Sequence, residues 1–469
     1  MKKFIKNKKE TPGPCHFYLR VLCEMLGMCI KMSELIYTLS KLGVHIPAIM
    51  LPAKNKDLNK WAVVACDQYT SEPEYWERVE ALTKDNPSTL NIIFPEVYLE
   101  GGDSDSRISD INAVMQQYID DRILSEIDKC FILTDRKTSH AQSRKGLIVA
   151  LDLECYDYNK GSNALIRATE GTVLDRLPPR IKIRQNAPIE LPHIMVLIDD
   201  PEKTVIEPLF RKSAQLEKLY DFELMMNGGH IKGYKVSDEK NLNSIADALC
   251  RLSQKDAFCS KYGVAADKDL LLFAVGDGNH SLASAKGHWE NLKKCLTPEQ
   301  QEEHPARYAL VELVNVHDEG LVFEPIHRVL FNVDAHDLLK KFEAFSGKTA
   351  CRDSRGTGST THTFSYVTAA GKGTISAENP VSNLEVGTLQ LFLDDYIKEH
   401  PQVKIDYIHG EDVVTKLGAQ SGNMGIYLPP MNKTDLFKTV ILDGALPRKT
   451  FSMGEAEEKR FYLECRKIK

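Results

Sequence analysis

The chain alternates short, continuous apolar runs with longer stretches in which apolar positions recur at helical spacing. The first pattern is typical of buried strands, and the second of helices that bury one face. We predict strands at 61–66, 145–153, 164–169, 193–198, 270–275, 309–316 and 321–323. We predict helices at 33–42, 71–82, 108–127, 242–253 and 280–294. A glycine-rich turn at 227–230 predicts a hairpin.

The texture of the chain changes after about residue 345. Residues 346–361 are rich in Gly, Ser and Thr and predict a loop. Beyond it we predict helices at 386–399 and 410–418 and strands at 424–428, 438–443 and 460–466. Helices and strands do not alternate in regular β–α–β units, which favours an α+β fold with a mixed sheet over a doubly wound fold. We therefore expect a main α+β domain at 32–345 and a smaller C-terminal α+β subdomain at 346–469.

The start of the chain differs in charge from the rest. Residues 1–32 hold seven Lys or Arg and two Glu, whereas the whole chain of 469 residues has a formal net charge of −6. Arg20 and Glu24 interrupt the apolar stretch that follows the basic residues, which is unlike a secretory signal. We predict that residues 1–31 form a basic extension outside the fold.

Composition limits the class of protein. The chain is 42% hydrophobic and 27% charged, as in ordinary globular proteins, and its mild negative charge argues against a nucleic-acid partner. No window of about 18 uncharged apolar residues predicts a membrane span. The 11 cysteines are irregularly spaced and form no C-x-x-C pair, which disfavours a zinc ribbon or a disulfide scaffold. We expect a reduced, cytoplasmic protein that binds a small-molecule substrate, with homo-oligomer formation left open.

The segment from Phe273 to Ser281 carries the sharpest chemical signal. It predicts a strand, a turn around Gly276 and Gly278, and the start of a helix within nine residues. Free N–H groups at a helix start bind anions, phosphate above all. The alternative is a plain turn in which Asp277 or Asn279 caps the helix.

Other segments hold groups that suit phosphate or proton chemistry. Arg side chains bind phosphate in a fork, and His can donate or accept a proton. The candidates lie at 167–176, 324–328 and 446–451, and their alternatives are a solvated loop, a structural His-Arg pair and a solvated basic turn. Asp67 follows a predicted strand and can equally cap a helix, and Cys66 beside it is more typical of a buried strand cysteine than of a nucleophile.

Four of these segments, in order, resemble the family known as domain of unknown function 1015, from about residue 40 to the C-terminus. An A-D-G-H-H-R element is matched by 276–281, an H-E-x-T…D-R element by 169–176, a P-x-H-R element by 325–328 and an M-P-x-K-S/T element by 446–450. The first element is also similar to that of the ParB and sulfiredoxin superfamily, which includes free-serine kinases. The chain departs from the pattern at Thr169, Asn279 and Ser281, where the family has His, His and Arg.

The resemblance implies a ParB/sulfiredoxin-like strand–turn–helix phosphate motif and phosphoryl transfer on a small hydroxy amino acid such as serine, with Mg²⁺ and an adenine nucleotide. It implies catalytic roles for Asp277, which would also bind the metal, His280 and Glu170. The implied phosphate or substrate ligands are Gly278, Asn279, Ser281, Arg167, Thr172, Arg176, His327, Arg328 and Lys449. Because Ser281 replaces the motif arginine, a non-catalytic nucleotide or metabolite-binding protein is the alternative.

Overall fold

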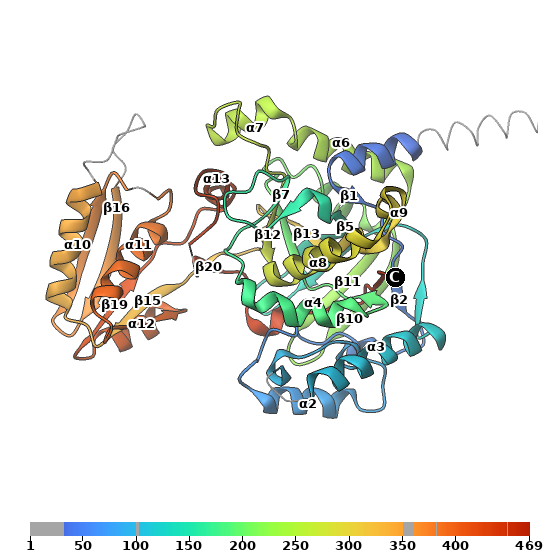
Figure 1. Ribbon diagram of the computed structural model, residues 1–469, viewed down its shortest axis with the longest axis horizontal. Helices are drawn as coiled ribbons and strands as arrows, with labels where there is room; N and C mark the ends of the chain where they lie inside the picture. Colours follow the sequence, from blue (N-terminus) through green and yellow to red (C-terminus); the bar gives the residue numbers. More distant parts are fainter. Residues whose placement is uncertain (1–31, 100–102, 350–360, 381, 448) are drawn as a thin grey trace, which may run out of the picture.

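The structure is a computed structural model that describes residues 32–99, 103–349, 361–380, 382–447 and 449–469. The predicted extension at 1–31 lies outside the described residues. The chain forms a main body and a second lobe, which we define as residues 327–428 (Figure 1). The main body holds a helix at 32–41 and all the elements that surround the candidate phosphate motif.

A mixed sheet forms the centre of the main body. Its strands lie in the order β10-β11-β4-β5-β13-β9-β12-β7-β6, and β1 pairs with β5. The strands are β1 (Val44–His45), β4 (Phe131–Lys137), β5 (Arg144–Asp152), β6 (Tyr156–Asp157), β7 (Ile166–Ala168), β9 (Met195–Ile198), β10 (Glu217–Leu224), β11 (Gly229–Val236), β12 (Phe273–Asp277) and β13 (Tyr308–Asn315). Strand β12 runs parallel to β7 and antiparallel to β9. The predicted α+β class with a mixed sheet is confirmed, and β10 and β11 form the predicted hairpin.

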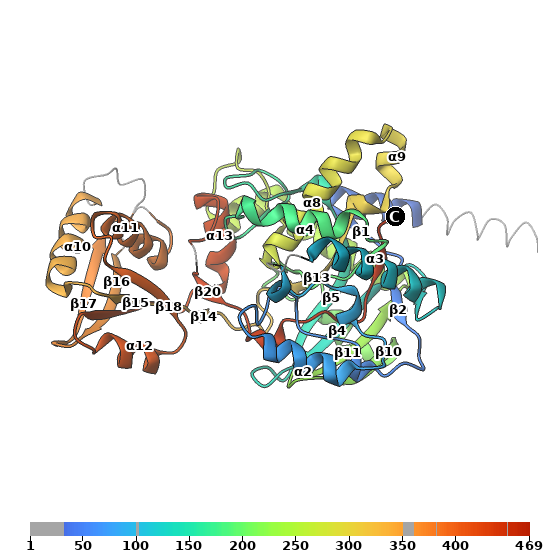
Figure 2. The ribbon, with the colours of Figure 1, turned by 60° about the horizontal axis from the view of Figure 1, so that its bottom comes forward.

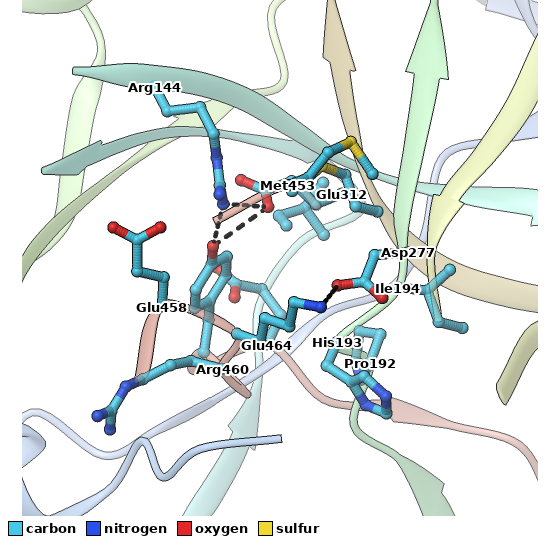
Figure 3. Close-up of a pocket in the computed structure, with 14 residues that line it drawn as sticks. Arg144, Pro192, His193, Ile194, Asp277, Glu312, Met453, Glu458, Arg460 and Glu464 are labelled. Carbon is cyan, nitrogen blue, oxygen red and sulfur yellow. Dashed lines mark hydrogen bonds and ion pairs between the residues drawn. The ribbon is translucent and has the colours of Figure 1, made fainter. Parts of the chain in front are cut away.

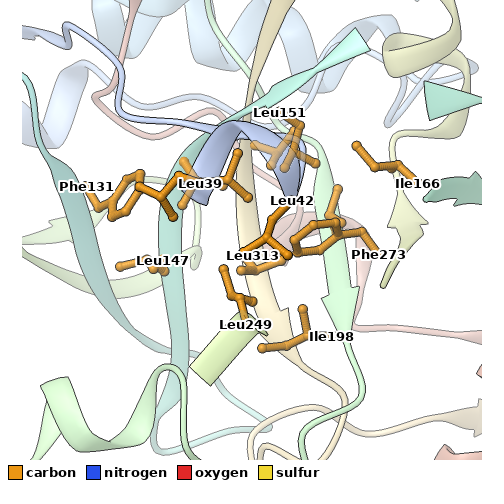
Figure 4. Close-up of a cluster of buried hydrophobic side chains, with 14 of the residues drawn as sticks. Leu39, Leu42, Phe131, Leu147, Leu151, Ile166, Ile198, Leu249, Phe273 and Leu313 are labelled. Atoms are coloured by element: carbon orange, nitrogen blue, oxygen red, sulfur yellow. The ribbon is translucent and has the colours of Figure 1, made fainter. Parts of the chain in front are cut away.

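Helices cover the sheet, and α4 packs beside α8 in both views (Figures 1 and 2). The helices of the main body are α2 (Pro73–Thr83), α3 (Ser104–Asp120), α4 (Leu177–Gln185), α5 (Glu207–Phe210), α6 (Glu239–Leu252), α7 (Lys255–Tyr262), α8 (Asn279–Leu292), α9 (Pro298–Glu303) and α13 (Lys433–Asp443). Phe273 of β12 lies in a fully buried cluster with Leu313 of β13 and Leu249 of α6 (Figure 4). This packing fixes the strand that leads into α8.

The second lobe is built on an antiparallel sheet in the order β17-β16-β19-β15-β18. Its strands are β15 (His327–Phe331), β16 (Thr361–Thr368), β17 (Gly371–Glu378), β18 (Lys404–Ile408) and β19 (Asn423–Tyr427). Its helices are α10 (Ala335–Thr349), α11 (Glu385–Glu399) and α12 (Glu411–Gly418). The short strand β14 (Glu324–Pro325) pairs with β20 (Phe451–Ser452), and this pair connects the second lobe to the main body.

The last residues return to the main body. Cys465 pairs with Met50, and β21 (Arg466–Lys467) pairs with β8 (Ile189–Glu190). A separate pair joins β2 (Met50–Pro52) to β3 (Leu124–Glu126). The C-terminal segment thus crosses the part of the molecule that holds the first strands.

The predicted boundary at 345 coincides with neither junction between the two parts. Position 345 lies inside α10, the second lobe begins earlier at β15, and the segment 451–469 belongs to the main body. Local composition could not show where the second lobe begins, because β15 pairs with β18 and β19, which lie more than seventy residues downstream.

Four predicted strands are wrong. Residues 460–466 hold only isolated bridges at Arg460 and Cys465 and the first residue of β21. Residues 438–443 are helical in α13, where Phe437, Val440 and Ile441 bury one helical face. Residues 321–323 form no strand, because β13 pairs with β5 and β9 instead of a neighbouring hairpin partner. Residues 61–66 form only an isolated bridge between Val64 and Arg460.

No helix within the described ranges is long and apolar enough to cross a membrane. The seven described cysteines carry free thiols.

Candidate functional site

The turn between β12 and α8 leaves the start of the helix open. Gly278 holds a φ of 77°, and a Cβ at this position would lie 3.0 Å from the Cα of Ile194. No side chain in the described part of the chain caps α8. Asp277 instead accepts a hydrogen bond on Oδ1 from the amide of Gly278, at 2.9 Å. The alternative in which Asp277 or Asn279 caps the helix is therefore wrong, and the first-turn amides remain available to a ligand.

Asp277 forms an ion pair with a lysine from the C-terminal segment. Its Oδ2 lies 3.2 Å from Nζ of Lys459 (Figure 3). The carbonyl of Lys459 accepts from the amide of Ala65 at 2.7 Å, which fixes the segment against the main body. Burial lowers the pKa of Lys459, but the charges of Asp277, Asp67 and Glu170 outweigh burial and raise it. Lys459 is therefore cationic at neutral pH.

Two further carboxylates surround this ion pair. Burial raises the pKa of Asp67, but His193, a 2.9 Å hydrogen bond from Gln68 and the charge of Lys459 lower it overall. Removal from water and the charge of Asp277 raise the pKa of Glu170. Glu170 thus holds its proton more tightly than Asp67 does, and the two differ in what they can do at one pH.

His280 and Ser281 lie on the first turn of α8. The Nε2 atom of His280 accepts the amide of Val173 at 3.2 Å. Burial and the charges of Arg180 and Arg176 lower the pKa of His280, so the ring is neutral with its proton on Nδ1. Its acceptor nitrogen is already engaged, which leaves the Nδ1 proton as the group it can offer.

Sequence reasoning missed His193, which lies at the centre of this region. Its Nε2 is 3.2 Å from Oγ of Ser281, and its ring packs edge-on against Phe461 with centroids 4.9 Å apart. His193 precedes β9, which runs antiparallel to β12. A histidine at the start of a predicted strand was the available signal, but the pairing of that strand with β12 depends on tertiary structure, which the sequence does not display.

The loop after β7 brings more of the predicted residues to the same place. Glu170 feels the charges of Asp277 and Lys449, and His280 feels the charge of Arg176. Two polar atoms here, Oγ1 of Thr172 and Oδ1 of Asn279, are buried and have no hydrogen-bond partner in the described ranges. These predicted residues gather around the start of α8: Glu170, Thr172, Arg176, Asp277, Gly278, Asn279, His280, Ser281 and Lys449.

The structure places three predicted residues elsewhere. Arg167 donates to the carbonyls of Ala164, Asp269 and Leu270, beside the opposite end of β12. It is buried to satisfy backbone oxygens and does not face Asp277.

His327 and Arg328 lie in the second lobe. Nδ1 of His327 accepts the amide of Leu428 at 3.1 Å. Arg328 is fully buried, donates to Oε1 of Gln390 at 3.1 Å and to two carbonyls, and stacks on Tyr407. The alternative of a structural His-Arg pair fits these contacts. The link of Arg328 to the site is the backbone carbonyl of Lys449, which accepts from its Nη2 atom at 3.1 Å.

Two cavities adjoin the site and share the wall formed by 192–194. The smaller, about 30 Å³, lies between the Asp277–Lys459 pair and a buried group in which Arg144 binds Glu312 at 3.0 Å (Figure 3). The larger, about 150 Å³, borders Ser281.

The environment of Cys66 agrees with a buried cysteine and does not suit a nucleophile. Burial, Asp67 and Glu96 raise the pKa of Cys66 well above its ordinary value, so its thiol stays protonated and unreactive. Among the residues that the structure describes, no group of three or more His, Cys, Asp or Glu side chains is arranged to hold a metal ion.

The family described as Protein of unknown function (DUF1015) matches residues 47–396. The chain belongs to this family. Lys449 and Lys459 lie beyond the matched residues. None of the curated proteins matches the chain significantly.

Among solved structures, the chain is similar to a conserved hypothetical protein from Pyrococcus furiosus. The two share 10% identity over 69% of this chain and 95% of that one, with a TM-score of 0.30. A TM-score of this size is too low to establish a shared fold.

Proposed function

We propose that this protein is a cytoplasmic enzyme that binds a phosphate group at the start of α8 and transfers it to or from a small hydroxy compound, with serine as the first candidate. The observation that carries the proposal is the helix start behind Gly278, which no side chain of the described residues caps, beside the hydroxyl of Thr172, which has no hydrogen-bond partner among the same residues. Backbone amides at such a start, together with a buried hydroxyl, are the donors that phosphate oxygens need.

The charges around the helix start support the same proposal. Arg176, Lys449 and Lys459 provide positive charge near Glu170, Asp277 and His280. Phosphoryl transfer depends mainly on positioning and on neutralising charge at the phosphate oxygens. Lys449 is exposed, so its ammonium group is open to a phosphate that approaches from solvent.

Asp277 is the residue we propose to orient the attacking hydroxyl. Its carboxylate is held on one side by the Gly278 amide and on the other by Lys459. Accepting a hydrogen bond from a substrate hydroxyl would place that oxygen beside the helix start. His280 would donate from Nδ1 and Ser281 from its hydroxyl, so both would stabilise charge instead of removing a proton.

The carboxylates of Asp277 and Glu170 match the small number of protein ligands that Mg²⁺ takes in nucleotide sites. Mg²⁺ takes one or two protein carboxylates together with substrate phosphates and water. Glu170 feels the negative charge of Asp277, so a bound divalent cation would offset the repulsion between the two carboxylates. Asp277 and Glu170 would hold the ion, and it would supply charge neutralisation on the transferred phosphate.

A second candidate function is non-catalytic binding of a nucleotide or metabolite. Two observations favour it: Ser281 stands where the family motif has an arginine, and Asp277 is already paired with Lys459. Such a protein would bind phosphate at the same place without turning it over.

Turnover distinguishes the two candidates. Purified protein is incubated with serine, Mg²⁺ and ATP or ADP, and ³¹P NMR follows phosphoserine, with phosphoserine plus AMP or water as the reverse reaction. Asp277→Asn is the matched variant, because it keeps the size of the side chain and removes the charge. Phosphoserine formed by wild type and absent from the variant supports the enzyme. A thermal shift with nucleotide and no turnover by wild type supports the binding protein.

A further inference from the structure

The larger cavity beside the helix start is built mainly from apolar side chains. It has a volume of about 150 Å³, and segments from distant parts of the chain line it. Its apolar lining includes Ile92, Phe94, Met115, Ile183, Leu191 and Phe461. Ser281 and His193, which belong to the proposed phosphate site, also line it. The cavity therefore reaches the edge of the proposed phosphate site at Ser281.

Most polar groups on the cavity wall already have partners, and the exception is Nε of Arg184, which is buried without a hydrogen-bond partner among the described residues. Arg180 forms an ion pair with Glu96, and Arg184 lies 2.5 Å from Glu190. The hydroxyl of Ser284 donates to the carbonyl of His280 at 2.7 Å. The wall therefore offers a ligand mainly apolar surface, apart from Nε of Arg184 and the end at Ser281 and His193.

Serine does not suit this cavity, because it is small and polar and would leave most of the apolar wall in contact with water. Burying apolar surface is the main source of affinity in such a cavity. The chemistry that suits both parts is an anion at the helix start joined to an apolar body in the cavity.

We propose that the ligand of this site is an amphipathic phosphate whose apolar body fills the cavity. This inference rests on the proposed phosphate site and corrects its substrate class from a serine-sized molecule to one with a sizeable hydrophobic group. Two sources share that chemistry, an alkyl or aryl phosphate and a nucleotide whose base occupies the cavity.

A homologous series tests the proposal on the full-length protein. Isothermal titration calorimetry measures the Kd of inorganic phosphate, phosphoserine and the n-alkyl phosphates from methyl to hexyl. Each buried methylene contributes about 0.8 kcal/mol, which is about a fourfold fall in Kd per carbon. AMP against ribose 5-phosphate measures what a base adds and so distinguishes the two sources.

Two variants assign the gain to this cavity. Ile183→Trp fills the space from α4 and should flatten the dependence of Kd on chain length. Gln185→Trp is the matched control, because Gln185 is exposed on the same helix and does not line the cavity. The wild-type series decides the proposal even if the Ile183 variant does not fold.

The outcomes separate the two proposals. If phosphate or methyl phosphate binds but neither the longer alkyl chains nor the base of AMP strengthens binding, the amphipathic ligand is refuted and the phosphate site stands. If no phosphate compound binds, the phosphate site itself is refuted, and this inference with it. A gain with chain length that survives in Ile183→Trp and matches Gln185→Trp would place the apolar body elsewhere and overturn the assignment.

Discussion

His288 should make the docking of α8 sensitive to acid. This residue is buried, and burial, then the charges of Arg184, Lys469 and His304, lower its pKa from 6.5 to about 4. The unfolded chain binds a proton at this side chain below pH 6.5, whereas the folded chain does so only near pH 4. The folded state therefore loses stability as the pH falls through this window. Because α8 carries the proposed phosphate site, the effect concerns function as well as stability.

The magnitude follows from the two pKa values. At 1.36 kcal/mol per unit, the full shift is worth about 3 kcal/mol, and the part expressed at pH 5 is about 2 kcal/mol. His288→Gln removes the titrating group. Its packing cost is constant with pH, so the free-energy difference between wild type and variant should shift by about 2 kcal/mol in favour of the variant from pH 7 to pH 5.

Urea unfolding at pH 7, 6 and 5 measures this shift through tryptophan fluorescence, to which Trp61, Trp76 and the neighbouring Trp289 contribute. The exposed His336→Gln on α10 is the control and should follow wild type at every pH. A difference between wild type and His288→Gln that stays constant from pH 7 to pH 5 would refute the reasoning, because it would show that His288 titrates alike in the folded and unfolded states.

Three other outcomes are expected. Gly278→Ala should destabilise the protein by about 1–2 kcal/mol and weaken phosphate-ligand binding about tenfold or more. The reason is that the φ of Gly278 is 77° and the added Cβ would meet a backbone atom at 3.0 Å. Calorimetry should show no such loss of binding for Gly171→Ala, whose added Cβ would meet nothing within 4 Å. Arg328→Ala should lower the free energy of unfolding by about 3–5 kcal/mol in urea titrations, and a loss of ligand affinity without loss of stability would contradict its structural role. Peptide mapping after brief alkylation at pH 7.5 should find the exposed Cys295 labelled well before Cys66, whose pKa is raised by burial, and equal labelling would argue against that protonated thiol.

The strand–turn–helix at the centre of the site could be predicted because its signals are local. The apolar run before Asp277, the two glycines and the polar helix start lie within nine residues, and β12 and α8 form where the pattern indicates. Helices such as α2, α6, α11 and α12 were predictable for the same reason, since the spacing of their apolar positions is visible along the chain.

The roles of the arginines could not be predicted in this way. Arg167 and Arg328 have the residue type that binds phosphate, yet each is buried and donates to backbone carbonyls. A guanidinium with five donors satisfies carbonyl oxygens as readily as phosphate oxygens. Which of the two it meets depends on the pairing of distant segments, and no local pattern records that pairing.

Lys459 shows most clearly how the site depends on tertiary structure. It stands 182 residues after Asp277 in the chain, directly before the predicted strand at 460–466, and nothing in that local pattern points to Asp277. Backbone hydrogen bonds from Ala65 to Lys459 and from Phe461 to Val63 hold this segment against the main body. Without it, Asp277, Asp67 and Glu170 would face one another with no cation from this segment to offset their repulsion. The charge balance that a phosphate would meet at α8 is therefore completed only when the C-terminal segment has docked.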